Sequence, residues 1–147
     1  MAHAQQQIID ALQALLAAGA TVAGTRVYAD SFDPLQGSAL PAIVLQESGE
    51  TIEEFTISGI EKRELSVQVH CVLAHNTTAI PAARSFGLAV EKLIAASTAL
   101  AALCSQGVRI TASRPDVDPG TERVLASRVQ SWTFSYLVQS TAPDIIL

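Results

Sequence analysis

Two segments of the chain carry apolar residues at the spacing of a helix. In residues 4–18, four apolar side chains fall at positions i, i+4, i+7 and i+8 on one stripe, and Gly19 is a natural helix end. The same spacing recurs after Pro81, a residue favoured in the first turn of a helix. The stripes consist of Ile8, Leu12, Leu15 and Leu16, and of Phe86, Val90, Leu93 and Ile94. We predict helices over residues 4–18 and from about residue 81, with residues 98–104 as a candidate for one or two further turns.

Other segments alternate apolar and polar residues with a period of two, which predicts strands. Residues 65–73 show the clearest alternation, and shorter strands are expected at about 25–28, 42–46 and 108–113. A long final strand is predicted over about residues 124–139. Its two faces hold Trp132, Phe134, Tyr136 and Val138 on one side, and Val129, Ser131, Thr133 and Ser135 on the other.

Turn residues separate these strands. Residues 30–38 are rich in such residues and are expected to form a loop. Residues 118–121 read Asp-Pro-Gly-Thr, which is typical of a type II turn. Residues 48–60 are weakly patterned, and we interpret them as the extension of two strands into a long protruding hairpin.

The order of the expected elements predicts an α+β fold. Strands that follow one another through short turns favour a largely antiparallel or mixed sheet, here of four to five strands. Two main helices are expected to pack on one face of that sheet. The length of 147 residues fits one domain over residues 1–147, with a short C-terminal tail at about 140–147.

The composition suggests an extensive interface with other subunits. Apolar residues make up 49% of the chain and charged residues 16%, against about 25% charged in an average domain. One small domain cannot hide that much apolar surface, so we expect self-assembly or a large partner surface. No secretory signal and no apolar run of membrane-spanning length is present, which predicts cytoplasmic synthesis and no membrane partner.

Two cysteines cannot form a disulfide-dense scaffold. Cys71 lies in the alternating strand pattern and is expected to behave as a small buried hydrophobic residue. A bridge between Cys71 and Cys104 is possible, but a domain of this size does not need one.

No catalytic or metal-binding motif is present. The three histidines are scattered, and no serine lies in a G-x-S-x-G elbow. Residues 19–26 resemble a phosphate loop only superficially, because Thr25 replaces the lysine and the segment follows a helix. The acidic stretch 116–122 has the wrong spacing for a calcium loop. We therefore predict a non-enzymatic protein with no cofactor and no bound metal.

Charge is unevenly distributed along the chain. Six of the eight glutamates lie within residues 47–64 against two basic residues, so this segment holds four of the five net negative charges. Four arginines cluster around the other predicted hairpin, at positions 109, 114, 123 and 128. In a ring of head-to-tail copies, the acidic hairpin of one subunit could meet the basic hairpin of the next. Charge reversal at Arg114 and Arg123 is expected to weaken such an assembly.

The chain as a whole resembles the tail terminator, or tail completion, proteins of long-tailed bacteriophages. The resemblance rests on the order of the elements and their pattern of apolar and polar residues over nearly the whole chain, not on an invariant motif. The segments that carry it are Gln7-Ile8-Ile9-Asp10-Ala11-Leu12, Arg26-Val27-Tyr28, Leu40-Pro41-Ala42-Ile43-Val44, Arg63-Glu64-Leu65-Ser66-Val67-Gln68-Val69, Ala89-Val90-Glu91-Lys92-Leu93-Ile94 and Trp132-Thr133-Phe134-Ser135-Tyr136-Leu137-Val138.

The resemblance implies a structural role in the virion, at the head-proximal end of the tail. Such proteins form a homo-oligomeric ring, expected to be a hexamer, on the last disc of the tail tube. The ring stops tube polymerisation and offers a surface to the head–tail connector. Its partners would be the tail tube protein and the connector or stopper protein, with DNA only passing through the lumen. No cofactor is implied.

Two other functions stay open on the sequence alone. One is another neck or head–tail connector (stopper) protein, and the other is a small dimeric ligand-binding α+β domain. For the favoured function, the candidate contact residues are those of the two hairpins and the C-terminus. They are Glu50, Glu53, Glu54, Phe55, Glu61, Arg109, Arg114, Arg123, Ile145, Ile146 and Leu147.

Overall fold

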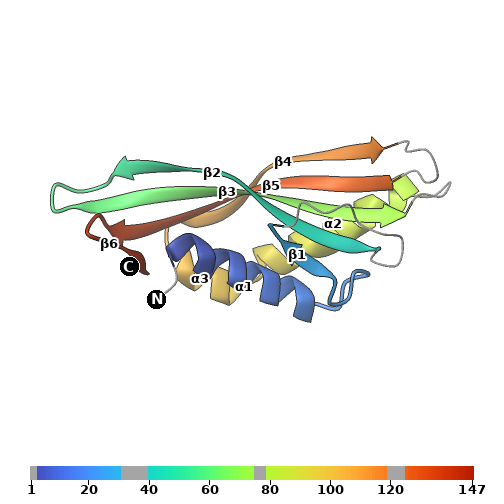
Figure 1. The fold of residues 1–147 in the computed structure, drawn as a ribbon, viewed down its shortest axis with the longest axis horizontal. Helices are drawn as coiled ribbons and strands as arrows, with labels where there is room; N and C mark the ends of the chain where they lie inside the picture. The colour runs from blue at the N-terminus through green and yellow to red at the C-terminus, as the bar shows by residue number, and fades with distance from the viewer. Residues whose placement is uncertain (1–2, 31–39, 75–78, 119–124) are drawn as a thin grey trace.

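The computed structural model describes residues 3–30, 40–74, 79–118 and 125–147. Within them, three helices lie on one face of a six-stranded mixed sheet (Figure 1). The elements are α1 (Ala4–Ala18), β1 (Val27–Ala29), β2 (Ala42–Glu54), β3 (Ile60–Ala74), α2 (Ala79–Ala95), α3 (Thr98–Leu103), β4 (Gly107–Asp118), β5 (Leu125–Gln139) and β6 (Ala142–Ile146). The α+β class predicted from the sequence is confirmed.

The strands are ordered β1-β2-β3-β5-β4, and β6 also pairs with β5. Only β1 and β2 are parallel, and the other pairs are antiparallel. The sheet twists strongly, so its strands overlap near the middle of the view in Figure 1. β5 pairs with β3 along its whole length, from Leu125 to Gln139, and therefore forms the spine of the fold.

The helices lie where the apolar periodicity predicts them. α1 has the predicted bounds, α2 begins two residues before Pro81, and residues 98–103 form the short third helix. α1 ends at Gly19, where a Cβ atom would lie 2.4 Å from a methyl carbon of Leu93 on α2. The small residue at the helix end therefore lets α1 and α2 approach closely.

The core lies between the helices and the inner face of the sheet. The face of β5 that carries Trp132, Phe134, Tyr136 and Val138 lies in this core, and these side chains are all at most 2% exposed. On the other face, Val129, Thr133 and Ser135 are buried as well. Cys71 and Cys104 are free thiols in this core, and burial raises the pKa of each to about 12. Neither thiol is therefore reactive near neutral pH.

The strands are longer than their hydrophobic pattern indicates. β2 and β3 continue as a hairpin to Glu54 and Ile60, as the weakly patterned segment suggested. Both faces of the outer half of β2 are exposed, so no alternation marks that half in the sequence. The register shifts between Glu47 and Gly49, and Gly49 takes the φ of +137° that this bulge requires. Residues 31–38 of the loop predicted at 30–38, and residues 119–121 of the turn predicted at 118–121, lie outside the described residues.

The C-terminal residues form a strand rather than the short tail predicted. β6 continues the line of β4, which stops pairing at Ser135 of β5. Ile146 lies opposite Val138 and packs against the core, and the Leu147 amide donates to the Leu137 carbonyl (2.9 Å). The Gln7 side-chain amide of α1 donates to the Asp144 carbonyl (2.8 Å). The sheet thus has six strands instead of four to five, because the short sequence of β6 carries no alternation.

We predict that Ile146→Ala lowers the free energy of unfolding by about 1–2 kcal/mol, because it removes partly buried apolar surface. The matched control is Ile145→Ala, whose side chain is 48% exposed on the same strand. The control should cost less than about 0.5 kcal/mol. Urea unfolding of the two variants measures both values, and equal losses would contradict the assigned packing of β6.

Candidate interaction surfaces

The outer part of the β2–β3 hairpin, residues 50–64, extends beyond the helices at one end of the molecule (Figure 1). We call it the arm. Its turn is fixed by hydrogen bonds from the Phe55 amide to the Ile60 carbonyl (2.9 Å) and from the Ser140 amide to the Gly59 carbonyl (2.8 Å). The second bond ties the arm to the end of β5, so the arm projects as part of the sheet.

A buried polar cluster lies at the base of the arm. The Glu50 carboxylate accepts hydrogen bonds from the Gln5 side-chain amide (2.9 Å), from Arg63 Nη1 (3.2 Å) and from the Tyr136 hydroxyl. Arg63 Nη2 also pairs with Glu61 Oε2 at 2.9 Å. The side chain of Glu50 is only 6% exposed and that of Arg63 only 11%. The cluster therefore joins α1, β2, β3 and β5 through satisfied polar groups.

The protonation states in this cluster follow from its surroundings. Burial disfavours the charge of Arg63, but the hydrogen bond to Glu61 and the charges of Glu50 and Glu61 outweigh it and raise the pKa of Arg63. Burial and then the hydrogen bond to Glu50 raise the pKa of Tyr136 far above its usual value. Arg63 therefore stays cationic and Tyr136 stays neutral. Both can then donate hydrogen bonds to the Glu50 carboxylate, which only accepts them.

Two of the candidate contact residues are engaged in this cluster. Glu50 and Glu61 bind partners inside the subunit, whereas Glu53, Glu54 and Phe55 are exposed. Exposed apolar side chains lie beside the free carboxylates: Ile52 is 55%, Phe55 50% and Ile57 101% exposed. We call residues 52–57 the arm tip. It combines two unpaired negative charges with three large apolar side chains.

A shallow hollow of about 230 Å³ lies under the arm, lined by Ile52, Glu54, Gly59, Ile60, Glu61 and Ser140. Of the candidate C-terminal contacts, Ile145 and Leu147 are 48% and 47% exposed, while Ile146 is partly buried against the core. The part of the C-terminus available to a neighbour is therefore Ile145 and Leu147.

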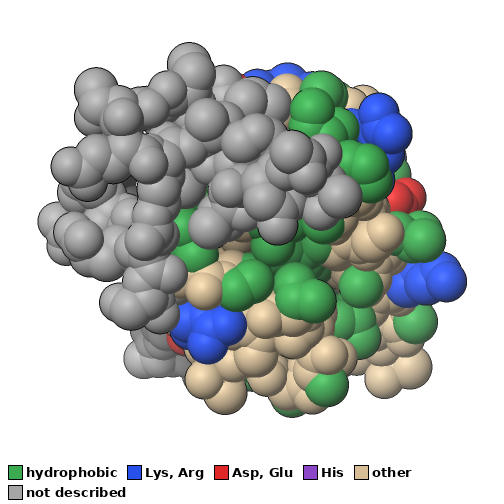
Figure 2. Space-filling model, turned by 90° about the vertical axis from the view of Figure 1, so that its right-hand side faces the viewer, with side chains coloured by type: hydrophobic (Ala, Val, Ile, Leu, Met, Phe, Trp, Pro, Cys, Tyr) green, Lys and Arg blue, Asp and Glu red, His purple; other side chains and the backbone are tan. Residues whose placement is uncertain are grey.

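Three arginines lie toward the opposite end of the molecule: Arg114 is exposed on β4, Arg84 is exposed on α2, and Arg128 is half-buried on β5. Arg109 is also exposed on β4, but it lies opposite Thr133 near the middle of β5 and therefore outside this group. Among the described residues, no carboxylate lies within 4.0 Å of these four guanidinium groups. Arg123 lies outside the described residues. Figure 2 looks onto this end and shows apolar and basic side chains together, with little acidic surface on the described part.

The acidic and basic ends are far apart on one rigid sheet. The arm turn lies beside Gln139 of β5, and the end of β4 lies beside Leu125. Fourteen residues of strand at about 3.3 Å each separate these positions by about 45 Å. The two ends cannot reach each other within one subunit.

The described part of the chain gives no indication of a metal site. Among the described residues, no group of three or more His, Cys, Asp or Glu side chains could hold a metal ion. In the same part of the chain, no helix is long and apolar enough to cross a membrane. His70 lies between Val44 and Val129 on the outer face of the sheet, and its Nε2 is buried without a hydrogen-bond partner in the described structure.

Comparison with solved structures gives a weak likeness in fold. No family model and no curated protein matches the chain. Among solved structures, a chain of a structure titled "Virion of native gene transfer agent (GTA) particle" is similar over 90% of this chain and 92% of the other. The sequences are 12% identical and the TM-score is 0.44. Similarity of this strength does not establish a shared function.

We predict that Glu50→Ala lowers the free energy of unfolding by about 3 kcal/mol, because it removes the acceptor of the Tyr136 hydroxyl and leaves the buried Arg63 charge paired with Glu61 alone. Glu53→Ala, on the same strand but exposed, is the matched control and should cost less than about 0.5 kcal/mol. Chemical unfolding measures both. A Glu50→Ala loss no larger than the control would show that the cluster does not hold the arm.

The lowered pKa of His70 in the folded protein predicts that stability depends on pH. Its pKa is lowered by burial first and then by Arg114, while Asp116 opposes the shift. Since the unfolded chain takes up this proton at higher pH than the folded one, His70 destabilises the fold as pH falls below about 6.5. The free energy of unfolding should therefore fall less for His70→Asn than for the wild type between about pH 6.5 and 5. Parallel curves would contradict this.

Proposed function

We propose that this chain is a structural subunit that assembles head-to-tail into a ring and caps the end of a bacteriophage tail tube. The main observation behind the proposal is that the two ends of one sheet present side chains of opposite charge. One end presents the exposed carboxylates of Glu53 and Glu54 with exposed apolar side chains, and the other presents arginines that have no carboxylate partner among the described residues.

This arrangement favours a contact between the two unlike ends over a two-fold contact centred on either end. A two-fold axis through the arm tip would place carboxylates against carboxylates. Like charges in an interface are costly, whereas opposite charges guide association and fix its register. A head-to-tail contact repeated with a closing rotation gives a ring.

The capping role is supported by the resemblance of the whole sequence to tail terminator proteins. A tube grows because each ring presents the same face to the next, and a terminator ring binds that face and presents a different one. Several copies acting together would make the attachment tight even where each contact is weak. The tail tube protein would be the partner on one side and the head connector on the other, at the head-proximal end of the tail. The acidic subunits would repel DNA in the lumen, so that it passes without binding.

The test is to add the purified protein to assembling tail tubes and to measure tube length by negative-stain electron microscopy. We expect a defined length and a distinct ring at one end, against overlong tubes without the protein. Unchanged tubes would overturn the terminator role, and binding to the connector instead would favour a stopper protein.

The arm tip provides a variant for the same assay. We predict that Glu53→Lys/Glu54→Lys lowers the fraction of capped ends about tenfold or more, because reversed charges oppose each subunit contact. The control Asp10→Lys/Glu47→Lys makes the same change in net charge at exposed positions outside the arm, and should cap normally. Equal loss in both variants would point to net charge and not to the arm tip.

A further inference from the structure

A groove of about 110 Å³ lies between α2 and β5 at the basic end. Its floor is built from buried groups: the Gln130 side-chain amide donates to the Gly87 carbonyl (2.8 Å), and its oxygen accepts from Trp132 Nε1 (3.0 Å). Gln130 is 1% exposed. A Cβ atom on Gly87 would lie 2.9 Å from Cγ of Arg128, so glycine on α2 allows Arg128 to cross close to the helix.

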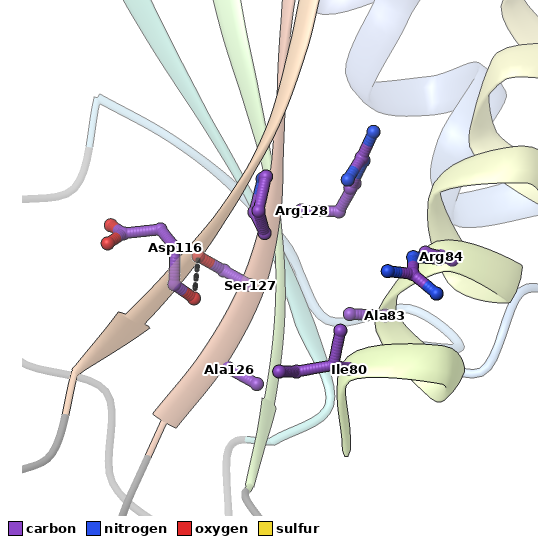
Figure 3. A pocket seen from close by; sticks show the side chains of 8 residues that line it. Ile80, Ala83, Arg84, Asp116, Ala126, Ser127 and Arg128 are labelled. Atoms are coloured by element: carbon purple, nitrogen blue, oxygen red, sulfur yellow. Dashed lines mark hydrogen bonds between the residues drawn. The ribbon is translucent and has the colours of Figure 1, made fainter. Parts of the chain in front are cut away.

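Two cations line this region without a carboxylate partner among the described residues. Arg84 and Arg128 both lie in the space between α2 and β5, whereas Asp116 lies on the far side of the strands (Figure 3). Arg128 Nε donates to Ser113 Oγ (2.8 Å), which holds the side chain in place and leaves its two terminal nitrogens for another acceptor. Guanidinium groups held in this way favour carboxylate ligands, which can accept two parallel hydrogen bonds.

One large apolar side chain, Leu88, lines the groove and is 52% exposed. Ile80 is 40% exposed on the same helix and lines a neighbouring hollow that also contains Arg84 and Arg128. Glu91 is the only carboxylate among the residues that line the groove. The region therefore combines two exposed apolar side chains and two cations with one anion, while the arm tip combines apolar side chains with two anions.

We propose that the groove between α2 and β5 receives the arm tip of a second copy of this chain. Phe55 and Ile57 would pack on Leu88 and Ile80, and the carboxylates of Glu53 and Glu54 would pair with Arg84 and Arg128. The inference rests on the proposed head-to-tail ring and names its contact. The arm of the same copy is excluded as the occupant, because Glu61, the strand partner of Glu54, lies opposite Val138, ten residues or about 33 Å along β5 from Arg128. The small volume fits side chains, since pockets for small molecules usually measure about 300–1,000 Å³.

Disulfide trapping tests this contact in the purified protein. The double variant Phe55→Cys/Leu88→Cys should form a ladder of cross-linked oligomers under mild oxidation at high protein concentration. The native cysteines do not interfere, because both thiols are buried and poorly ionised. The control Phe55→Cys/Val22→Cys places the second thiol at an exposed site outside the groove, where Val22 is 61% exposed. We expect at least about tenfold more cross-linking than in this control, and equal amounts would overturn the proposal.

A charge swap tests the ion pairs independently. In the Phe55→Cys/Leu88→Cys background, Arg84→Glu/Arg128→Glu should abolish the ladder, and adding Glu53→Arg/Glu54→Arg should restore it. If the Arg128 variant fails to fold, Arg84→Glu alone with Glu54→Arg replaces it, since Arg84 is exposed. Failure of the restored pairs to cross-link would overturn the groove contact.

The cross-linking assay tests the groove contact and the tube-capping assay tests the terminator function, so each proposal can be refuted without the other. Capping by the wild type without cross-linking would refute the groove contact and leave the terminator function standing. Cross-linking without capping would support the groove contact and refute the terminator function.

Discussion

The buried carboxylate of Glu50 is the interaction on which the shape of this subunit depends. A hairpin that extends past its helices has little apolar surface to hold it, and its outer half is exposed on both faces. Glu50 compensates by accepting hydrogen bonds from α1, β3 and β5 at the base of the arm. Because Arg63 and Tyr136 are buried with it, the cluster is stable only when all its members are present. The arm is therefore a rigid extension of the sheet.

Because the arm continues the sheet, it holds the acidic arm tip at a defined distance from the basic end. Negative charge in a mobile loop would bind many surfaces weakly, whereas the charge on this hairpin is presented about 33 Å from the basic groove, too far to reach it within one copy. Because the same sheet carries both ends, the proposed contact would set the angle between neighbouring copies. β6 contributes to this rigidity, since it fills the position along β5 that β4 leaves empty and is tied to α1 through Gln7. In the proposed ring, the fold thus determines both the polarity and the closure of the assembly.

Periodicity in the sequence was a reliable guide where one face of an element is buried. It predicted α1 to its end residues and separated the two faces of β5, one of which lies in the core. It could not predict β6, whose five residues lack alternation, or the full length of the arm, whose outer strands face solvent on both sides. Nor could it separate Glu50 from Glu53 and Glu54, because the difference lies in contacts with Gln5 and Tyr136, far away in the chain. The groove residues Arg84 and Gly87 were missed for the same reason: they meet Arg128 only through tertiary packing.

Electron cryo-microscopy of tail tubes assembled in the presence of this protein tests the proposed ring directly. We predict a closed ring of elongated subunits at the tube end, with the arm tip of each subunit on α2 of the next. The resemblance to tail terminators predicts six subunits. Subunits related in pairs by two-fold axes, or a tube end with no added ring, would contradict it.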